Sequence, residues 1–316
     1  MRRLLFVLVF FSLLVGAQAQ DAIAPISEAS YGQNGDLRYI QIPLTQPDCM
    51  NITATPIIVG DWLVYPAHTR RECGPNSEPF GDILFGYNLQ DGQLYSLYRG
   101  GSGEAVLTYD EANGVVYWTM TFGGNLTLFD APAMTERTRV NLGMTADSSA
   151  TLLNGLAYLG TVNGPSAACQ QPINPDCGKM VAVDSAGQVI DSLGMDDGLR
   201  AWFGTSPTTD GTYLYWGSAA QTVGEKTGDE TEYLYGCSVI KTDAELNILA
   251  NFDPGDMACY KLSFQGANMD SVSGEVVPDG TGLWVQYVRP NDAEMVSHVY
   301  HLDLNLQMQC DFTFPF

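Results

Sequence analysis

The sequence predicts an all-β fold, a β-propeller made of five four-stranded antiparallel repeats. An apolar, aromatic-rich strand that follows a turn recurs at residues 61–65, 114–118, 155–159, 211–216 and 280–285 (DWLVY, GVVYW, GLAYL, GTYLYW and GTGLWV). A second hairpin follows each of these strands, and the connections alternate between short and long. Repeats of this length, built from four short strands, are typical of propeller blades.

Each repeat divides into strands A, B, C and D, in chain order. Asn-Gly and Asp-Gly pairs such as Asn113-Gly114 and Asp210-Gly211 fall between paired strands, where a positive φ favours glycine. In the order A to D, the expected strands are 54–59, 61–67, 83–89 and 93–98; 105–109, 115–121, 125–129 and 136–141; 150–153, 156–162, 179–184 and 188–193; 206–209, 213–218, 237–242 and 247–252; and 274–277, 282–288, 298–303 and 306–312.

The connection lengths predict that the two ends of the propeller differ. The A–B and C–D links are short, whereas many B–C and D–A links are long. In an up-and-down blade the B–C and D–A links leave from one end, and long loops on a rigid scaffold commonly carry function. We therefore expect that end to be the working face. Its long links are residues 66–82, 163–178, 219–236 and 289–297 (B–C) and 194–205 and 253–273 (D–A).

Residues 1–19 are expected to be a signal peptide. Arg2 and Arg3 form a basic start, residues 4–15 are apolar, and Ala17-Gln18-Ala19 fits a cleavage site. The apolar run is too short for a membrane span, and no later stretch approaches the roughly 20 apolar residues that one needs. The sequence thus predicts a secreted or periplasmic protein without a membrane span.

Residues 20–48 form an N-terminal extension, and the propeller domain is expected over residues 49–316. Within the extension, residues 37–44 (LRYIQIPL) read as a D strand, although the fifth repeat has a D strand of its own. This strand either pairs with the edge of the last blade and fastens the ring, or belongs to a partial sixth blade. We favour the fastening role, because an open sheet edge invites aggregation.

The chain is strongly acidic. Its formal net charge is −22, and removal of Arg2 and Arg3 with the signal peptide makes it about −24, which repels phosphate backbones and anionic surfaces. Nucleic-acid binding is therefore excluded. Hydrophobic residues make up 45% of the chain and aromatic residues 11%, so the chain can bury a large core and is not a disordered acidic polymer.

Seven cysteines follow the expected cleavage site, and an exported protein meets conditions that favour disulfides. The strand assignment places six of them near the loop end, where bridges would hold the long loops in shape. Cys310, on the last D strand, is left over, and stapling is favoured over redox catalysis because no Cys-x-x-Cys pair occurs. The suggested pairs are Cys49 with Cys73, Cys169 with Cys177, and Cys237 with Cys259.

Two C–D hairpins share one form, at residues 87–94 (YNLQDGQL) and 183–190 (VDSAGQVI). They resemble the C–D hairpin of the pyrroloquinoline-quinone-like propeller repeat. The resemblance implies a quinoprotein-like propeller, a group that holds enzymes and many non-enzymatic envelope proteins. Its cofactor-dependent members carry a vicinal Cys-Cys pair, which this sequence lacks. The resemblance therefore implies such a propeller without the quinone.

Carboxylates near the starts of the A strands are the candidates for catalysis, because five-bladed propellers include glycosidases that set acidic side chains around the axis. The weak catalytic candidates are Asp196, Asp197, Glu275 and Glu104. Arg200 and Trp202, beside Asp196 and Asp197, could hold a sugar by stacking and hydrogen bonds. The ligand-binding candidates are Arg200, Trp202, Asp147 and Asp270. In so acidic a chain, carboxylates that merely face solvent are the alternative.

Calcium is the one cofactor that the sequence suggests, through oxygen-rich loops. Its weak candidates are Asp196, Asp253 and Asp256, and solvated acidic loops are the alternative because no calcium-loop spacing is matched. His298 and His301 are an odd number of residues apart on one strand and so face opposite sides of the sheet. No nucleophile elbow, phosphate loop or dinucleotide fingerprint is present.

The B-strand aromatics, such as Trp62, Trp118, Trp216 and Trp284, are expected at one register, packed between blades. The function that the sequence favours is therefore a non-catalytic propeller that binds a protein, peptide or glycan through its loop end. A glycan-active hydrolase with axial carboxylates is the alternative, followed by a quinone-dependent oxidoreductase.

Overall fold

The computed structural model describes seventeen stretches of the chain. These are residues 27–28, 30–34, 37–41, 50–52, 54–69, 82–99, 102–122, 124–142, 148–161, 178–194, 203, 206–218, 238–252, 261–264, 267–270, 277–290 and 295–315. They form an all-β structure in which five antiparallel sheets follow one another along the chain. None of the described residues forms a helix of the length and apolarity that a membrane span requires.

The five sheets are blades one to five, and in each the strands pair in chain order. Blade one has β5 (Ile57–Val59), β6 (Trp62–Thr69), β7 (Asp82–Asn88) and β8 (Gln93–Arg99), blade two β9 (Ser102–Asp110), β10 (Val115–Phe122), β11 (Asn125–Asp130) and β12 (Thr135–Asn141), and blade three β13 (Thr151–Leu153), β14 (Leu156–Gly160), β15 (Met180–Val183) and β16 (Val189–Leu193). Blade four has β17 (Thr208–Thr209), β18 (Leu214–Gly217), β19 (Val239–Thr242) and β20 (Ile248–Phe252), and blade five β23 (Val277–Pro278), β24 (Gly282–Pro290), β25 (Met295–Asp303) and β26 (Met308–Pro315).

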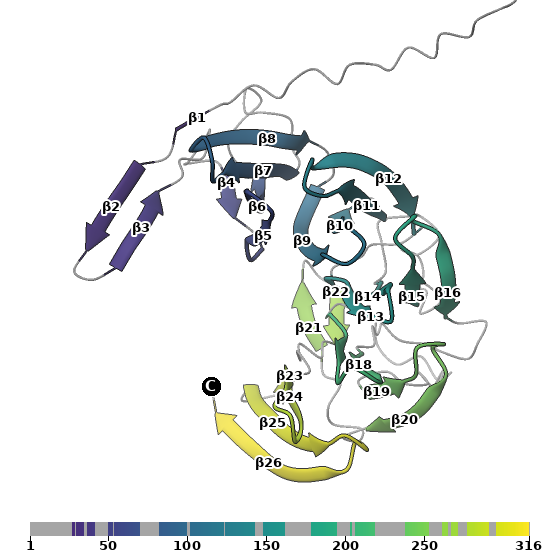
Figure 1. Ribbon diagram of the computed structural model, residues 1–316. Coiled ribbons are helices and arrows are strands. Elements are labelled where there is room, and N and C mark those ends of the chain that lie inside the picture. The colour runs from purple at the N-terminus through teal and green to yellow at the C-terminus, as the bar shows by residue number, and fades with distance from the viewer. Residues whose placement is uncertain are drawn as a thin grey trace, which may run out of the picture.

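The blades are arranged around an arc, with the D strands β8, β12, β16, β20 and β26 along its outer rim (Figure 1). The A strands lie on the inner side, and inter-blade hydrogen bonds join them. Thr108 Oγ1 donates to the carbonyl of Ala150 at 2.7 Å, and Thr151 Oγ1 donates to the carbonyl of Pro207. The predicted fold class, a β-propeller of four-stranded antiparallel blades, is confirmed.

The core lies between the blades. Successive residues of a B strand point to opposite faces of the sheet, so each blade packs on two neighbours. Tyr117 packs with Ala157 of blade three, whereas the next residue, Trp118, packs with Val64 of blade one. Four hydrophobic clusters of this kind join blades one and two, two and three, three and four, and four and five.

The B-strand tryptophans do not share one register, contrary to the prediction. Trp118 and Trp216 belong to the clusters that join their blades to the preceding ones, and both are almost fully buried. Trp62 packs toward the following blade, and Trp284 points away from the cluster that joins blades four and five. The B strands start at different distances from their aromatic residue, and a shift of one residue moves a side chain to the other face.

The C–D turns share a geometry that reaches beyond the two hairpins with the sequence pattern. In blades three, four and five an aspartate at the end of the C strand or directly after it accepts two backbone amides of its own turn. The amides of Ala186 and Gln188 donate to Asp184, those of Glu245 and Asn247 to Asp243, and those of Asn305 and Gln307 to Asp303. One residue in every C–D turn has a positive φ. These residues are Gly92, Met134, Gly187, Leu246 and Leu306.

The N-terminal strand expected to fasten the ring is placed differently. Within the described residues, β3 (Leu37–Gln41) pairs with β2 (Ser30–Asn34) in a two-stranded hairpin and not with the last blade. Only two residues separate β2 from β3, so this local pairing closes a far shorter loop than pairing with blade five would. Two other short strands extend blade one: β1 (Ser27–Glu28) pairs with β8, and β4 (Met50–Ile52) pairs with β6.

Two of the predicted long links also hold more strand than expected. In blade five, β24 and β25 pair as far as Pro290 opposite Met295, so the expected link 289–297 shrinks to residues 291–294. The expected link 253–273 contains a hairpin of its own, β21 (Lys261–Phe264) and β22 (Ala267–Asp270). In both places apolar residues recur in the links, which the sequence interpretation read as loops.

Candidate binding face

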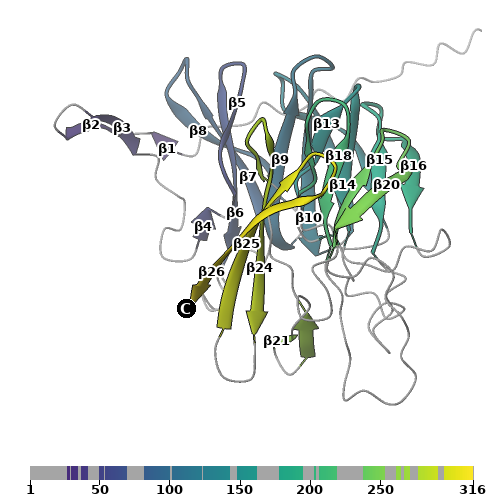
Figure 2. The ribbon, with the colours of Figure 1, turned by 90° about the horizontal axis from the view of Figure 1, so that it is seen from below.

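Strand order places the short turns and the longer links at opposite ends of the blades. The strands run antiparallel in chain order, so the A–B and C–D turns share one end and the B–C and D–A links leave from the other. Figure 2 shows the turn end at the top, while β21 and the far ends of β24 and β25 lie at the opposite end. We call that opposite end the loop end.

Two of the longest links start from buried polar bases. In blade three the amide of Lys179 donates to Thr161 Oγ1 at 2.9 Å, at the base of the link 162–177. In blade four the amide of Ser238 donates to Ser218 Oγ at 2.8 Å, at the base of the link 219–237. Thr161, Ser218 and Ser238 are almost fully buried. Each base fixes where its link leaves the blade, because a buried polar group that is hydrogen-bonded is costly to pull apart.

The D–A links are anchored too. Phe203, in the link between blades three and four, is fully buried, and its amide donates to the carbonyl of Thr161 at 3.1 Å. Its ring lies 5.9 Å from that of Trp216. Gly160 makes room for it, since a Cβ there would lie 2.2 Å from Phe203 Cβ. Ser148, at the end of the link between blades two and three, is buried and bonds to Gly160 in the same region.

The predicted site residues border these anchors in sequence. Trp202 directly precedes Phe203, and Asp147 directly precedes Ser148. Glu104 lies on β9 and Asp270 on β22, but their side chains lie outside the described part of the structure. The remaining candidates fall wholly outside the described residues. They are Asp147, Asp196, Asp197, Arg200, Trp202, Asp253, Asp256, Glu275, Cys49, Cys73, Cys169, Cys177, Cys237 and Cys259.

Of the cysteines, Cys310 is described, and it is free and partly buried on β26. His301 lies opposite Cys310 in the ladder and stacks on Trp284, with 4.5 Å between ring centroids. His301 Nε2 is 3.2 Å from Asp279 Oδ2, although the angle does not suit a hydrogen bond. These residues lie on the last blade and away from the links, so the sequence interpretation did not join them into a group.

Aspartates at the turn end have structural roles. Asp279 accepts the amides of Thr281 and Gly282 through Oδ1 and the indole N–H of Trp284 through Oδ2. Hydrogen bonds from the hydroxyl and amide of Thr281 hold the pKa of Asp279 well below its usual range. A lowered pKa suits a permanently ionised turn anchor, whereas a general acid needs a raised one.

Asp210 occupies the same position in blade four. Its Oδ1 accepts the amides of Thr212 and Tyr213, and its Oδ2 accepts the hydroxyl of Tyr215. Burial alone would raise the pKa of Asp210, but the hydrogen bonds from Tyr213, Thr212 and Tyr215 outweigh it and lower that pKa. The sequence identified both aspartates only as turn formers, and the Asp-Gly-Thr pattern that they share marks the additional bond to the aromatic side chain.

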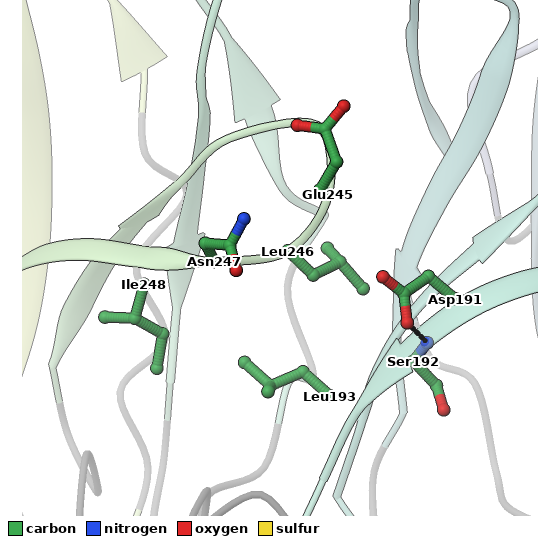
Figure 3. Close-up of a pocket in the computed structure, with 7 residues that line it drawn as sticks. All are labelled: Asp191, Ser192, Leu193, Glu245, Leu246, Asn247 and Ile248. Atoms are coloured by element: carbon green, nitrogen blue, oxygen red, sulfur yellow. Dashed lines mark hydrogen bonds between the residues drawn. The ribbon is translucent and has the colours of Figure 1, made fainter.

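A groove on the outer rim was not foreseen from the sequence (Figure 3). It has a volume of about 470 Å³ and lies between β16 of blade three and the C–D turn of blade four. Burial, followed by the charges of Glu245, Asp243 and Asp191, raises the pKa of Tyr158 beneath it to about 12. Two carboxylates, those of Asp191 and Glu245, line the groove and give it a negative charge. Its lining residues are Asp191, Ser192, Leu193, Glu245, Leu246, Asn247 and Ile248.

Blades, turn anchors and a loop end together define a β-propeller protein. No protein-family model and no curated protein matches the chain. In backbone it is similar to the Dos1 propeller (12% identity, TM-score 0.44, 73% of this chain and 55% of that one), to a protein from Lactobacillus plantarum (14%, 0.49, 84% and 71%) and to a chain of a nidogen/laminin complex (12%, 0.42, 92% and 91%). The chain thus spans little more than half of the Dos1 propeller chain, and these likenesses concern the fold alone.

Proposed function

We propose that this protein is an exported, non-catalytic β-propeller that binds a protein, peptide or glycan through its loop end. The observation that carries the proposal is the set of buried anchors beneath the links. Thr161 and Ser218 hold the bases of two B–C links, and Phe203 fixes a D–A link between them. Binding sites are commonly built from loops that a rigid scaffold holds in place.

Export and the relation to quinoprotein-like repeats belong to the same proposal. The basic and apolar start of the chain supports export. The shared C–D turn geometry in blades three, four and five supports the resemblance to pyrroloquinoline-quinone-like repeats, because the aspartate and the residue of positive φ recur there. We propose a relative of these propellers that works without the quinone.

The binding site is proposed at the link that Phe203 anchors. Arg200 and Trp202 lie just before it and supply a cation and an aromatic surface, the side chains that most often dominate binding energy at interfaces. A partner would contact this link while Phe203, buried against Trp216, keeps the scaffold unchanged. The binding groups and the anchor are thus separable by mutation.

A binding screen tests the proposal. The protein without residues 1–19 is applied to a printed glycan array and to a displayed random-peptide library. We expect binders that are lost in the R200A/W202A double variant and kept in the V189S/I190S variant, whose two residues are exposed on the rim of blade three. Near-ultraviolet circular dichroism checks that both variants fold.

Three outcomes would overturn the proposal. Binding that survives R200A/W202A but fails in V189S/I190S would move the site to the exposed rim of blade three. Retention of every ligand in both variants would remove the site from the link 194–205. Turnover of an arrayed glycan that disappears in D196N or E275Q would establish the alternative, a hydrolase with axial carboxylates.

A further inference from the structure

Neighbouring blades are joined by one repeated contact. In blades three and four, an aromatic residue of the B strand faces the following blade and is covered by the C–D turn of that blade. Tyr158 donates its hydroxyl to the carbonyl of Ala244, and Tyr215 does the same to the carbonyl of Leu304 (2.8 and 3.4 Å). Ala244 and Leu304 each directly follow the aspartate of a C–D turn. We call such an aromatic residue a seat and the turn its cover.

Trp284 occupies the seat position of blade five. It follows Leu283, which faces blade four, just as Tyr215 follows Leu214, which faces blade three. Its indole N–H bonds to Asp279 as the hydroxyl of Tyr215 bonds to Asp210. The ring contacts described for Trp284 are with His301 and Phe312 of its own blade. Trp284 is therefore held by Asp279, but among the described residues no C–D turn covers it.

The surface around Trp284 is mostly aromatic and partly exposed. Trp284, His301 and Cys310 stand opposite one another across three strands, so they share a face. Phe312 joins them with its ring 6.0 Å from that of Trp284, and 47% of it is exposed. We call these four residues the open face of blade five. The equivalent seats Tyr117, Tyr158 and Tyr215 are 1% exposed or less, so a face of this kind is normally covered.

We propose that the open face of blade five is the docking surface for the N-terminal hairpin β2–β3 of the same chain, which closes the arc there as a partial sixth blade. The hairpin is a two-stranded sheet that belongs to no blade among the described residues, and such a hairpin is at best marginally stable alone. In Figure 1 the hairpin and β26 border the same open side of the arc. Within the described parts of the chain, the hairpin thus lacks a sheet to pack on, and the open face of blade five lacks a sheet that covers it.

Both connections of the hairpin lead to short strands that pair with blade one, so the hairpin would dock by turning about these two links. One residue separates β1 from β2, and residues 42–49 connect β3 to β4. The latter tether extends to about 28 Å at most. A short tether also gives the hairpin an effective concentration of about a millimolar at its own blade five. Docking within one chain therefore outcompetes docking onto a second copy at ordinary protein concentrations.

Cys310 allows a direct test, because it lies on the open face and is free. Four single variants, Y31C, G32C, R38C and Y39C, sample both faces of the hairpin. On mild oxidation we expect at least one of them to form a disulfide with Cys310 inside one chain, mapped by peptide mass spectrometry and abolished by C310S. I190C, exposed on the rim of blade three, is the matched control and should not pair with Cys310.

A second measurement needs no engineered disulfide. Gly32 pairs with Tyr39 in the hairpin, and G32P removes a ladder amide there. We expect maleimide labelling of Cys310 to become about tenfold faster in G32P, as for a site freed from a local cover. Disulfides only between chains would overturn docking in cis. Absence of any disulfide, or an unchanged labelling rate in G32P, would overturn the docking itself.

Discussion

At the scale of single residues, Asp279 and Asp210 show how one carboxylate fixes both a turn and a side chain. One oxygen accepts the amides of the A–B turn, and the other accepts the polar tip of an aromatic residue on the B strand. That aromatic residue lies between blades in blade four and on the open face in blade five. In each blade the same aspartate carboxylate thus fixes both the A–B turn and the aromatic side chain of the B strand.

We expect D279A to destabilise the protein in a pH-dependent way. The folded state lowers the pKa of Asp279, so its stabilising effect is present above the pKa of the unfolded chain, near 3.9. That effect is lost as the pH falls through the folded value. The difference in unfolding free energy between wild type and D279A, measured in urea, should therefore shrink between pH 6 and pH 3.

E111A provides the control, because Glu111 is an exposed carboxylate at the tip of another A–B turn. This variant should stay within about 0.5 kcal/mol of wild type. A D279A deficit that is the same at both pH values would mean that the ionised carboxylate is not what stabilises the turn.

At the scale of elements, the C–D turn works as a cover because its residue of positive φ can carry a large side chain. Leu246 and Leu306 have φ of 58° and 62° and are 2% and 3% exposed. Leu246 packs with Tyr158 of blade three, and Leu306 packs with Tyr215 of blade four. In blade three Gly187 takes this position, and a Cβ there would lie 2.5 Å from Thr138 Cγ2 of blade two.

We expect L246A to cost about 2–5 kcal/mol of unfolding free energy, as for other buried leucines. L246G should be no worse than L246A, because glycine adopts a positive φ without the strain of about 1–2 kcal/mol that other residues bear. L249A, at a half-exposed position on the same hairpin, should stay within about 0.5 kcal/mol. Urea unfolding of the three variants measures this order, and a large loss in L249A would contradict it.

The blades could be predicted from the sequence because turn glycines and apolar strands recur with them. The shared C–D geometry was visible only where glycine marks it, at Gly92 and Gly187. Leu246 and Leu306 hide it, because leucine is not a turn signal and its positive φ is held by packing. The partner of β3 could not be predicted either. The residue pattern of a strand shows that the strand must pair with another one, but it does not show which strand that is.

At the scale of the whole molecule, the net charge of −22 opposes the compact state by repulsion between carboxylates. Salt screens this repulsion, with a Debye length of about 10 Å at 0.1 M. We expect the melting temperature to rise by about 2 °C or more between 0.05 and 0.5 M sodium chloride. Choline chloride should have the same effect if screening is the cause, and a melting temperature that is flat or falls with salt would contradict it.

For the proposed binding face, the sequence could predict only the end of the blades from which the long links leave. Link lengths identified the loop end, and antiparallel pairing requires the links to leave there. The anchors Thr161, Ser218 and Phe203 were missed because Ser, Thr and Phe in a link carry no distinctive pattern. Which of Asp196, Asp197, Arg200 and Trp202 converge depends on the path of the link, and spacing along the chain does not encode that path.

The repeated contact between seat and cover gives the chain of blades a head and a tail. Both observed covers lie on the preceding blade. Among the described residues, blade one therefore has a C–D turn with no earlier blade to cover, and no later turn covers Trp284 of blade five. Architectures in which each repeat contacts only its neighbours behave as one-dimensional polymers. In this respect the protein resembles a short filament with two unlike ends. The turn of blade one and the aromatic residue of blade five are different surfaces, and what binds to each of them determines whether the arc stays open, closes or gains another unit.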